Sequence, residues 1–427
     1  MRRVLSIFFA LTVASAFLLG GCKKTEDNNT ALLLAALSGR DIYSGSNPEG
    51  HFVEVSIDRI NKKIDFTDYT DSANNLSDLD YTWLDPGNAL SDPDPGGFSI
   101  LYRVNLPAPS GAYALCAEIP GVAVVIAPLD STGDMLEPPT FAFKRKNVAQ
   151  SRYYQKAFNW LHVTIDDEDS KPDVMCGFVA SDSAGLPTPN GLLYGAEYSI
   201  QDDETTDINP DDLAVGNLVQ DEVSRAFVGW LADVGDWSNA IVLIGDPDAA
   251  MQIIYGENQG SGGAFAIPQA SAKEFQAAYA GTYAAIVFQY DKDEMEESSY
   301  PVTVEFTAAG NIKVFNFGDD TSSALPLMDS PLTPLEDFDS GTQINDLNTE
   351  SHLNLATYDG IKRAYQSHGA FIAQGSIEGN PVIVTVLFDP QGRFAGFHLY
   401  NDDGNDGNVL NDILSFGLAI KDAKFSN

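Results

Sequence analysis

The chain has 427 residues, with 24 lysines and arginines against 61 aspartates and glutamates, so its formal net charge at pH 7 is −37. Such a charge repels phosphate backbones and anionic lipid headgroups, which argues against nucleic acid as a partner. With 44% hydrophobic residues, the chain is long enough to bury the cores of about two or three domains.

The first 22 residues have the pattern of a bacterial export signal. Two arginines precede an apolar run from Val4 to Leu19. The run ends in Leu19-Gly20-Gly21-Cys22, which resembles the lipobox of bacterial lipoproteins. The resemblance implies that residues 1–21 are a cleaved signal peptide and that Cys22 carries acyl chains such as palmitate.

An acylated Cys22 would anchor the protein to a membrane, because two or three acyl chains hold a protein there almost permanently. Cleavage removes 21 of the 427 residues and both leader arginines, leaving 406 residues with 22 cations against 61 carboxylates, a net charge of −39. In the lipoprotein class an aspartate after the cysteine favours inner-membrane retention, and Lys23 stands there instead. We therefore expect a cell-envelope protein, with the outer membrane favoured.

The sequence pattern predicts a mainly β fold with an α+β middle. Two β-rich sandwich or barrel-like domains are expected on either side of a central helical segment. The predicted segments are a lipidated tether with a short apolar helix at 22–39, a β-rich domain at 40–200, an acidic loop and helical segment with two strands at 201–265, and a second β-rich domain at 266–427.

The first β-rich segment contains two kinds of strand. Val53, Val55 and Ile57 alternate with polar residues, which predicts a half-buried strand that enters a hairpin. The run from Val122 to Ala127 is apolar throughout, which is typical of a strand that is covered on both faces.

The middle segment is predicted to hold the clearest helix. Asn209 can cap it, and apolar residues such as Val219, Val223 and Phe227 then recur at three- and four-residue spacing up to Gly235. Strands are expected to follow, and the domain boundary is placed near the glycine-rich loop from Gly256 to Gly263.

The second β-rich segment begins with a predicted capping box, Ser271 to Glu274, that opens a short helix. This helix runs into Gly281-Thr282-Tyr283, followed by up-and-down hairpins. The arrangement resembles the start of lipocalin-type barrels, whose motif is Gly-x-Trp, although tyrosine here replaces tryptophan. The resemblance implies a cavity for an apolar ligand.

Cys116 and Cys176 are the cysteines that remain after Cys22. Outside the cytosol disulfides persist, so the sequence predicts a bridge between these two residues. Two separately buried thiols are the alternative.

One stretch departs from the acidic background by interleaving cations with aromatic residues. Such a stripe can stack on sugars or hold anionic groups, and its alternative role is to pair with the chain's own acidic loops. The candidate ligand residues are Lys144, Arg145, Lys146, Arg152, Tyr153 and Trp160.

An Asp/Asn/Gly loop near the C-terminus is a weak calcium candidate, because calcium takes six to eight oxygen ligands. Its residues are Asp402, Asp403, Asn405 and Asp406, and the alternative is a solvated turn. The sequence indicates no other cofactor.

The sequence contains none of the usual catalytic or nucleotide-binding motifs, such as HExxH, GxSxG or a Walker loop. The hypothesis that remains is a lipid-anchored binding or adhesion module with an unknown protein or glycan ligand. The alternatives are a hydrolase that acts on glycans outside the cytoplasm and a carrier of apolar ligands with a lipocalin-like barrel.

Overall fold

The computed structural model describes only part of the chain, and the descriptions below refer to that part. It comprises residues 40–69, 71–83, 101–146, 156–165, 172–182, 192–198, 214–220, 227–230, 240–254, 262–291, 296–316, 319, 321–335, 367–377, 379–401 and 413–421. The predicted signal peptide, Cys22, the tether and the calcium candidate at 402–406 lie outside these residues.

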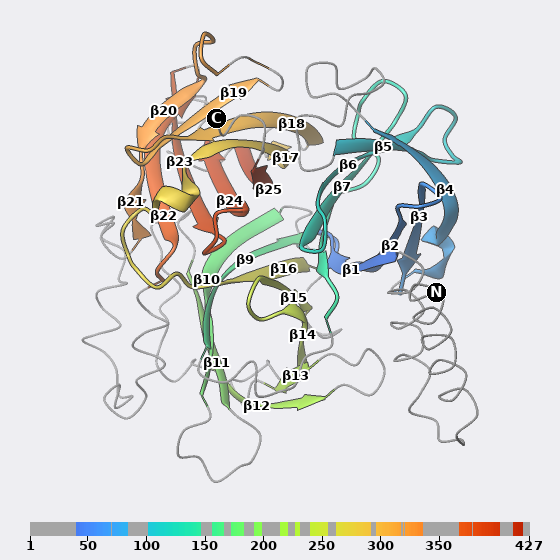
Figure 1. Cartoon of the computed structure of the whole chain (residues 1–427), viewed down its shortest axis with the longest axis horizontal. Helices are drawn as coiled ribbons and strands as arrows, with labels where there is room; N and C mark the ends of the chain where they lie inside the picture. Colours follow the sequence, from blue (N-terminus) through green and yellow to red (C-terminus); the bar gives the residue numbers. More distant parts are fainter. Residues whose placement is uncertain are drawn as a thin grey trace, which may run out of the picture. The chain divides into compact units, whose positions relative to one another are not determined.

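The first eight strands form a closed antiparallel barrel in chain order, called here the first barrel (Figure 1). Its strands are β1 (Arg40–Ser46), β2 (Phe52–Asp58), β3 (Lys63–Asp68), β4 (Leu76–Trp83), β5 (Leu101–Asn105), β6 (Tyr113–Ile119), β7 (Ala123–Leu129) and β8 (Thr140–Lys144). The barrel closes where β1 pairs with β8, with Tyr43 opposite Lys144 and Ser46 opposite Phe141.

The next eight strands form a second closed antiparallel barrel, the second barrel (Figure 1). Its strands are β9 (Lys156–Ile165), β10 (Pro172–Asp182), β11 (Leu192–Tyr198), β12 (Ala214–Gln220), β13 (Phe227–Trp230), β14 (Ala240–Asp246), β15 (Ala250–Ile254) and β16 (Gly262–Pro268). It closes where β9 pairs with β16, with Trp160 opposite Ala266.

The remaining strands form a nine-stranded antiparallel sheet in the order β20-β19-β18-β17-β25-β24-β23-β22-β21. Its strands are β17 (Gly281–Asp291), β18 (Glu296–Phe306), β19 (Asn311–Asn316), β20 (Met328–Pro331), β21 (Thr333–Pro334), β22 (Ala370–Ile377), β23 (Asn380–Phe388), β24 (Phe394–Asn401) and β25 (Ile413–Lys421).

The two edges of this sheet come together although β20 and β21 are not hydrogen-bonded to each other. Only Leu332 separates β20 from β21 along the chain, so the backbone itself passes from one edge to the other. Gly375 in β22 permits this approach, because a Cβ there would lie 2.4 Å from the Ser330 hydroxyl oxygen in β20.

Several strands are buried on both faces, and this explains their continuous apolar sequences. In β6, Ala114 and Cys116 face the core inside the first barrel, whereas Leu115 and Ala117 belong to a core cluster that includes residues from all three sheets. The interpretation of 122–127 as a strand covered on both faces is therefore confirmed by β7.

The predicted mainly β class and the barrel-like sheets are confirmed. The predicted central helix is wrong, because residues 214–220 and 227–230 are strands β12 and β13, with Val219 opposite Val228. Gly216 and Gly229 each disfavour a helix by about 1 kcal/mol, while valine and aromatic residues suit strands. The helical spacing was misleading here because barrel pairing decides the local structure.

The helix predicted from the capping box is also wrong. Its place is taken by bends and a single 3-10 turn, η4 (Ala277–Tyr279), whose N-cap residue Gln276 makes no side-chain capping bond. Phe275 and Tyr279 pack here against Phe388.

The sheets do not follow the predicted segment boundaries. Residues 40–200 supply the whole first barrel and three strands of the second barrel, and the second barrel ends at Pro268. Asp41–Asn427 form a single compact unit. Within the described residues, no helix has the length and apolar character that crossing a bilayer requires.

Candidate functional site: the charged network of the first barrel

The three consecutive cations of the predicted ligand stripe bind three different carboxylates. Lys144 contacts Asp41, the Arg145 Nη1 atom lies 2.6 Å from a Glu54 carboxylate oxygen, and the Lys146 Nζ atom lies 2.5 Å from an Asp246 carboxylate oxygen. Their acidic partners lie on β1, β2 and β14. The cations are therefore neutralised individually and do not form one anion-binding patch.

The other members of the stripe are placed differently or lie outside the described residues. Trp160 is buried in β9, with 3% of its surface exposed. Arg152 and Tyr153 lie outside the described residues. The alternative role of the stripe, pairing with the chain's own acids, fits the described members better.

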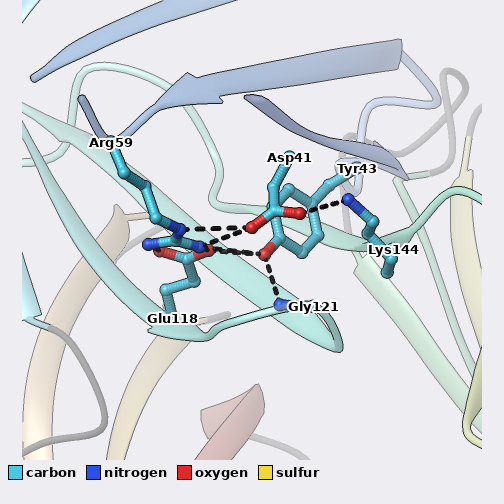
Figure 2. A network of polar contacts seen from close by, with 6 residues as sticks. All are labelled: Asp41, Tyr43, Arg59, Glu118, Gly121 and Lys144. Carbon is cyan, nitrogen blue, oxygen red and sulfur yellow. Dashed lines mark hydrogen bonds and ion pairs between the residues drawn. The ribbon is translucent and has the colours of Figure 1, made fainter. Parts of the chain in front are cut away.

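Lys144 belongs to a polar network that joins five parts of the first barrel (Figure 2). The network consists of Asp41 and Tyr43 from β1, Arg59 from the β2–β3 turn, Glu118 from β6, Gly121 from the β6–β7 turn and Lys144 from β8.

The β2–β3 turn holds Arg59 in place for this contact. β2 ends at Asp58, whose carboxylate accepts hydrogen bonds from the backbone N–H groups of Ile60 and Asn61 at 3.1 and 3.0 Å. Such a carboxylate-capped turn satisfies backbone donors that the sheet leaves unpaired. The capped turn therefore fixes the backbone that carries the Arg59 side chain.

Glu118 is the buried centre of the network, with none of its surface exposed. One Glu118 oxygen accepts a hydrogen bond from Arg59 Nη1 at 3.1 Å, and the other accepts from the Tyr43 hydroxyl at 2.5 Å and from Arg59 Nη2. The Tyr43 oxygen in turn accepts from the Gly121 N–H at 2.9 Å. Both oxygens of this buried carboxylate are therefore satisfied.

Asp41 links the two cations of the network. It accepts hydrogen bonds from Arg59 Nε and Nη2 at 3.2 and 2.9 Å, and its other oxygen accepts from Lys144. The two carboxylates thus balance the charges of Arg59 and Lys144. A neutral and fully engaged network stabilises the barrel and leaves no charge for an external ion.

The pKa shifts fit a structural role. Burial raises the pKa of Glu118, and the opposing effects of Arg59 and Tyr43 do not outweigh it. Burial also raises the pKa of Asp41, but hydrogen bonds and charge from Lys144 and Arg59 more than compensate and hold that pKa below its usual range. Burial and the Glu118 charge raise the pKa of Tyr43, so its phenol stays protonated and cannot act as a base.

Cys116 corrects the disulfide prediction. It is a free thiol, buried in the core inside the first barrel, and burial raises its pKa well above the usual value. Cys176 lies on β10 of the second barrel. Because Cys116 faces the interior of a different closed sheet, the two residues are not bridged.

A second charged pair joins the β1–β2 connection to the end of β3. The His51 Nδ1 atom lies 2.7 Å from an Asp68 carboxylate oxygen, and Nε2 lies 3.9 Å from Glu49. Burial lowers the pKa of His51, but the hydrogen bond and charge of Asp68, with Glu49 and Glu137 nearby, raise it overall above 6.5.

Sequence reasoning missed most of the network. Glu118 carried the one usable signal, since it is a charge within the otherwise apolar strand sequence YALCAEI. Nothing local marks Asp41, Tyr43 or Arg59, because barrel closure brings them together. For metals, the part of the chain that the structure describes contains no group of three or more potential His, Cys, Asp or Glu ligands.

Comparison with known proteins leaves the family open: no family model and no curated protein matches the chain. Among solved structures, transferrin-binding protein B from Haemophilus parasuis matches with 9% identity and a TM-score of 0.25, over 88% of this chain and 66% of that one. The Neisseria meningitidis protein of that name matches with 8% identity and a TM-score of 0.24, over 87% and 66%. A Nostoc punctiforme protein of unknown function has 8% identity and a TM-score of 0.15, over 90% and 94%.

This chain therefore spans slightly less than two-thirds of the length of those two transferrin-binding proteins.

We predict that Arg59→Leu lowers the free energy of unfolding by about 3 kcal/mol, because Glu118 is left buried without its cation. Removing one partner of a buried ion pair costs about 3–5 kcal/mol, and the lower value applies here because Arg59 is partly exposed. Urea unfolding checks this. Lys63→Leu, which removes a surface ion pair with Asp80, is the control and should have a far smaller effect. A loss from Arg59→Leu as small as that of the control would contradict the role given to the network.

We predict that the His51–Asp68 pair stabilises the fold more at low pH. Because the pKa of His51 is raised by folding, its contribution is fully present below about 6.5 and is lost as pH rises through the folded-state value. His51→Asn should flatten this part of the Tm-versus-pH curve. A difference in Tm between the unchanged protein and His51→Asn that stays constant from pH 5 to pH 9 would refute the assignment.

Proposed function

We propose that this chain is a lipid-anchored binding module of the cell envelope, attached to the outer membrane through Cys22. The observation that carries the proposal is the lipobox-like end of an export signal, Leu19-Gly20-Gly21-Cys22, ahead of a β-sheet body in which the first barrel and the nine-stranded sheet surround packed side chains. The ligand is a protein or a glycan that the outer surface recognises.

The packing inside the sheets favours recognition on the outside. Tyr43, Tyr102 and Phe143 are among the largest fully buried side chains, and the first two belong to the core inside the first barrel. The nine-stranded sheet surrounds a cluster that includes Tyr283, Phe306 and Phe388. In these two sheets, aromatic side chains therefore occupy the positions in which a lipocalin-like carrier would hold an apolar ligand.

The described connections between strands supply exposed surface that such a module could use. The β7–β8 connection, residues 130–139, exposes Ser131, Thr132, Asp134 and Leu136. Connections between strands are common places for binding residues. The net charge of −37 makes a neutral or basic ligand easier to approach than an anionic one.

The groups of the charged network are arranged for stability and not for acid–base chemistry. Its carboxylates, guanidinium and phenol are all bound to one another, and Tyr43 and Arg59 both have raised pKa values that keep them protonated. A general acid or base needs a pKa near the working pH and access to a substrate.

We predict that Cys22→Ala moves the protein from the membrane fraction to the soluble fraction, because the acyl chains are lost. Immunoblotting of fractionated cells measures this. Cys116→Ala is the matched control and should stay with the membranes, since that thiol is buried in the barrel. A Cys22→Ala protein that still pellets with membranes would refute the anchor.

We predict saturable binding without turnover when the purified full-length mature protein is tested against glycan and peptide libraries. Binding is followed on immobilised protein, and the same libraries are analysed for cleavage products by mass spectrometry. Accumulation of products that depends on the protein would instead identify a hydrolase.

A further inference from the structure

Tyr69 is an aromatic side chain on the outer face of the first barrel. It directly follows β3 and has 57% of its surface exposed. Its ring stacks on that of Phe52 at the start of β2, with ring centroids 5.2 Å apart and planes 23° apart. The backbone N–H of Tyr69 also donates to the Phe52 carbonyl at 2.9 Å. Phe52 therefore supports one face of the tyrosine ring.

A paired carboxylate and guanidinium lie beside this ring. The Tyr69 hydroxyl lies 3.4 Å from a Glu54 carboxylate oxygen, and the same oxygen accepts from Arg145 Nη1 at 2.6 Å. Glu54 is two residues after Phe52 on β2, so both side chains lie on the outer face of the strand, opposite to Val55 and Ile57 inside the barrel. The residues Phe52, Glu54, Tyr69 and Arg145 are called here the aromatic platform.

We propose that the aromatic platform is a subsite for one ring of a neutral saccharide, a proposal that rests on the binding function given above and names its ligand. The polarised C–H groups on one face of a sugar ring would lie against the electron-rich face of Tyr69. Glu54 would accept a hydrogen bond from a sugar hydroxyl, and Arg145 would donate one.

Charge and size select this ligand over others. Glu54 disfavours an anionic group and Arg145 a cationic one, and the net charge of −37 adds to the repulsion of anions. A stable protein interface buries about 800 Å² on each partner, far more than one stacked aromatic pair offers. A single uncharged ring that carries hydroxyl groups matches both the flat surface and the paired donor and acceptor.

The test measures binding of neutral oligosaccharides of glucose, galactose, mannose and N-acetylglucosamine to the full-length mature protein by calorimetry. Tyr69→Ala should weaken binding about tenfold, the equivalent of about 1.4 kcal/mol, because the stacking surface is lost. Tyr69→Phe keeps the ring and should bind within about threefold of the unchanged protein. Tyr300→Ala, which removes a 38% exposed tyrosine from β18, is the control and should bind as before.

The outcomes separate this inference from the proposed function. Saccharide binding that Tyr69→Ala leaves unchanged overturns the platform but keeps the binding module. Saturable binding of a protein, together with no binding of any oligosaccharide in the panel, also overturns the platform and keeps the binding module. Absence of binding to both glycans and peptides overturns the two proposals together. Thermal unfolding of each variant verifies that it is folded.

Discussion

The burial of strands on both faces is the constraint on which the rest of the structure depends. One core cluster takes residues from the first barrel, the second barrel and the nine-stranded sheet, among them Phe141, Phe265 and Phe416. The Phe265 ring lies 6.1 Å from that of Phe141 and 5.6 Å from that of Phe416, as measured between centroids. On strands such as β6 and β17 that contribute to this cluster, the other face covers the core inside the first barrel or the core of the nine-stranded sheet, so that face is buried as well. The described core is therefore packed on both sides of these strands, and the binding function that we propose would use turns and outer surfaces.

The charged network follows from the same constraint. Glu118 lies on a strand that is buried on both faces, so its carboxylate can be accommodated only with Arg59 and Tyr43 as partners. Two neighbouring cations at the end of β8 then have different partners. Lys144 completes the network, whereas Arg145 reaches Glu54 beside the aromatic platform. Two adjacent residues thus have different tasks, one in stability and one, as we propose, in saccharide binding.

Much of the fold could be predicted from local pattern, because alternation and continuous apolar runs report directly on burial. The hairpin around Val53 to Phe66 and the doubly buried β7 are examples. Pairing between distant strands could not be predicted in this way. The apolar spacing at Val219 and Phe227 suits a helix as well as a strand, and only closure of the second barrel decides between them. The network and the platform escaped prediction for the same reason, since Arg59 and Glu118, or Glu54 and Arg145, become neighbours only when the first barrel closes.

Native-state hydrogen exchange tests most directly whether the three sheets share one core. The slowest amides of β6, β16 and β17 should open with the same free energy, because all three strands contribute to the common cluster. Phe265→Ala should lower that free energy in all three strands together, by about 3–5 kcal/mol. Loss of protection in β16 alone, with β6 and β17 unchanged, would contradict a single shared core.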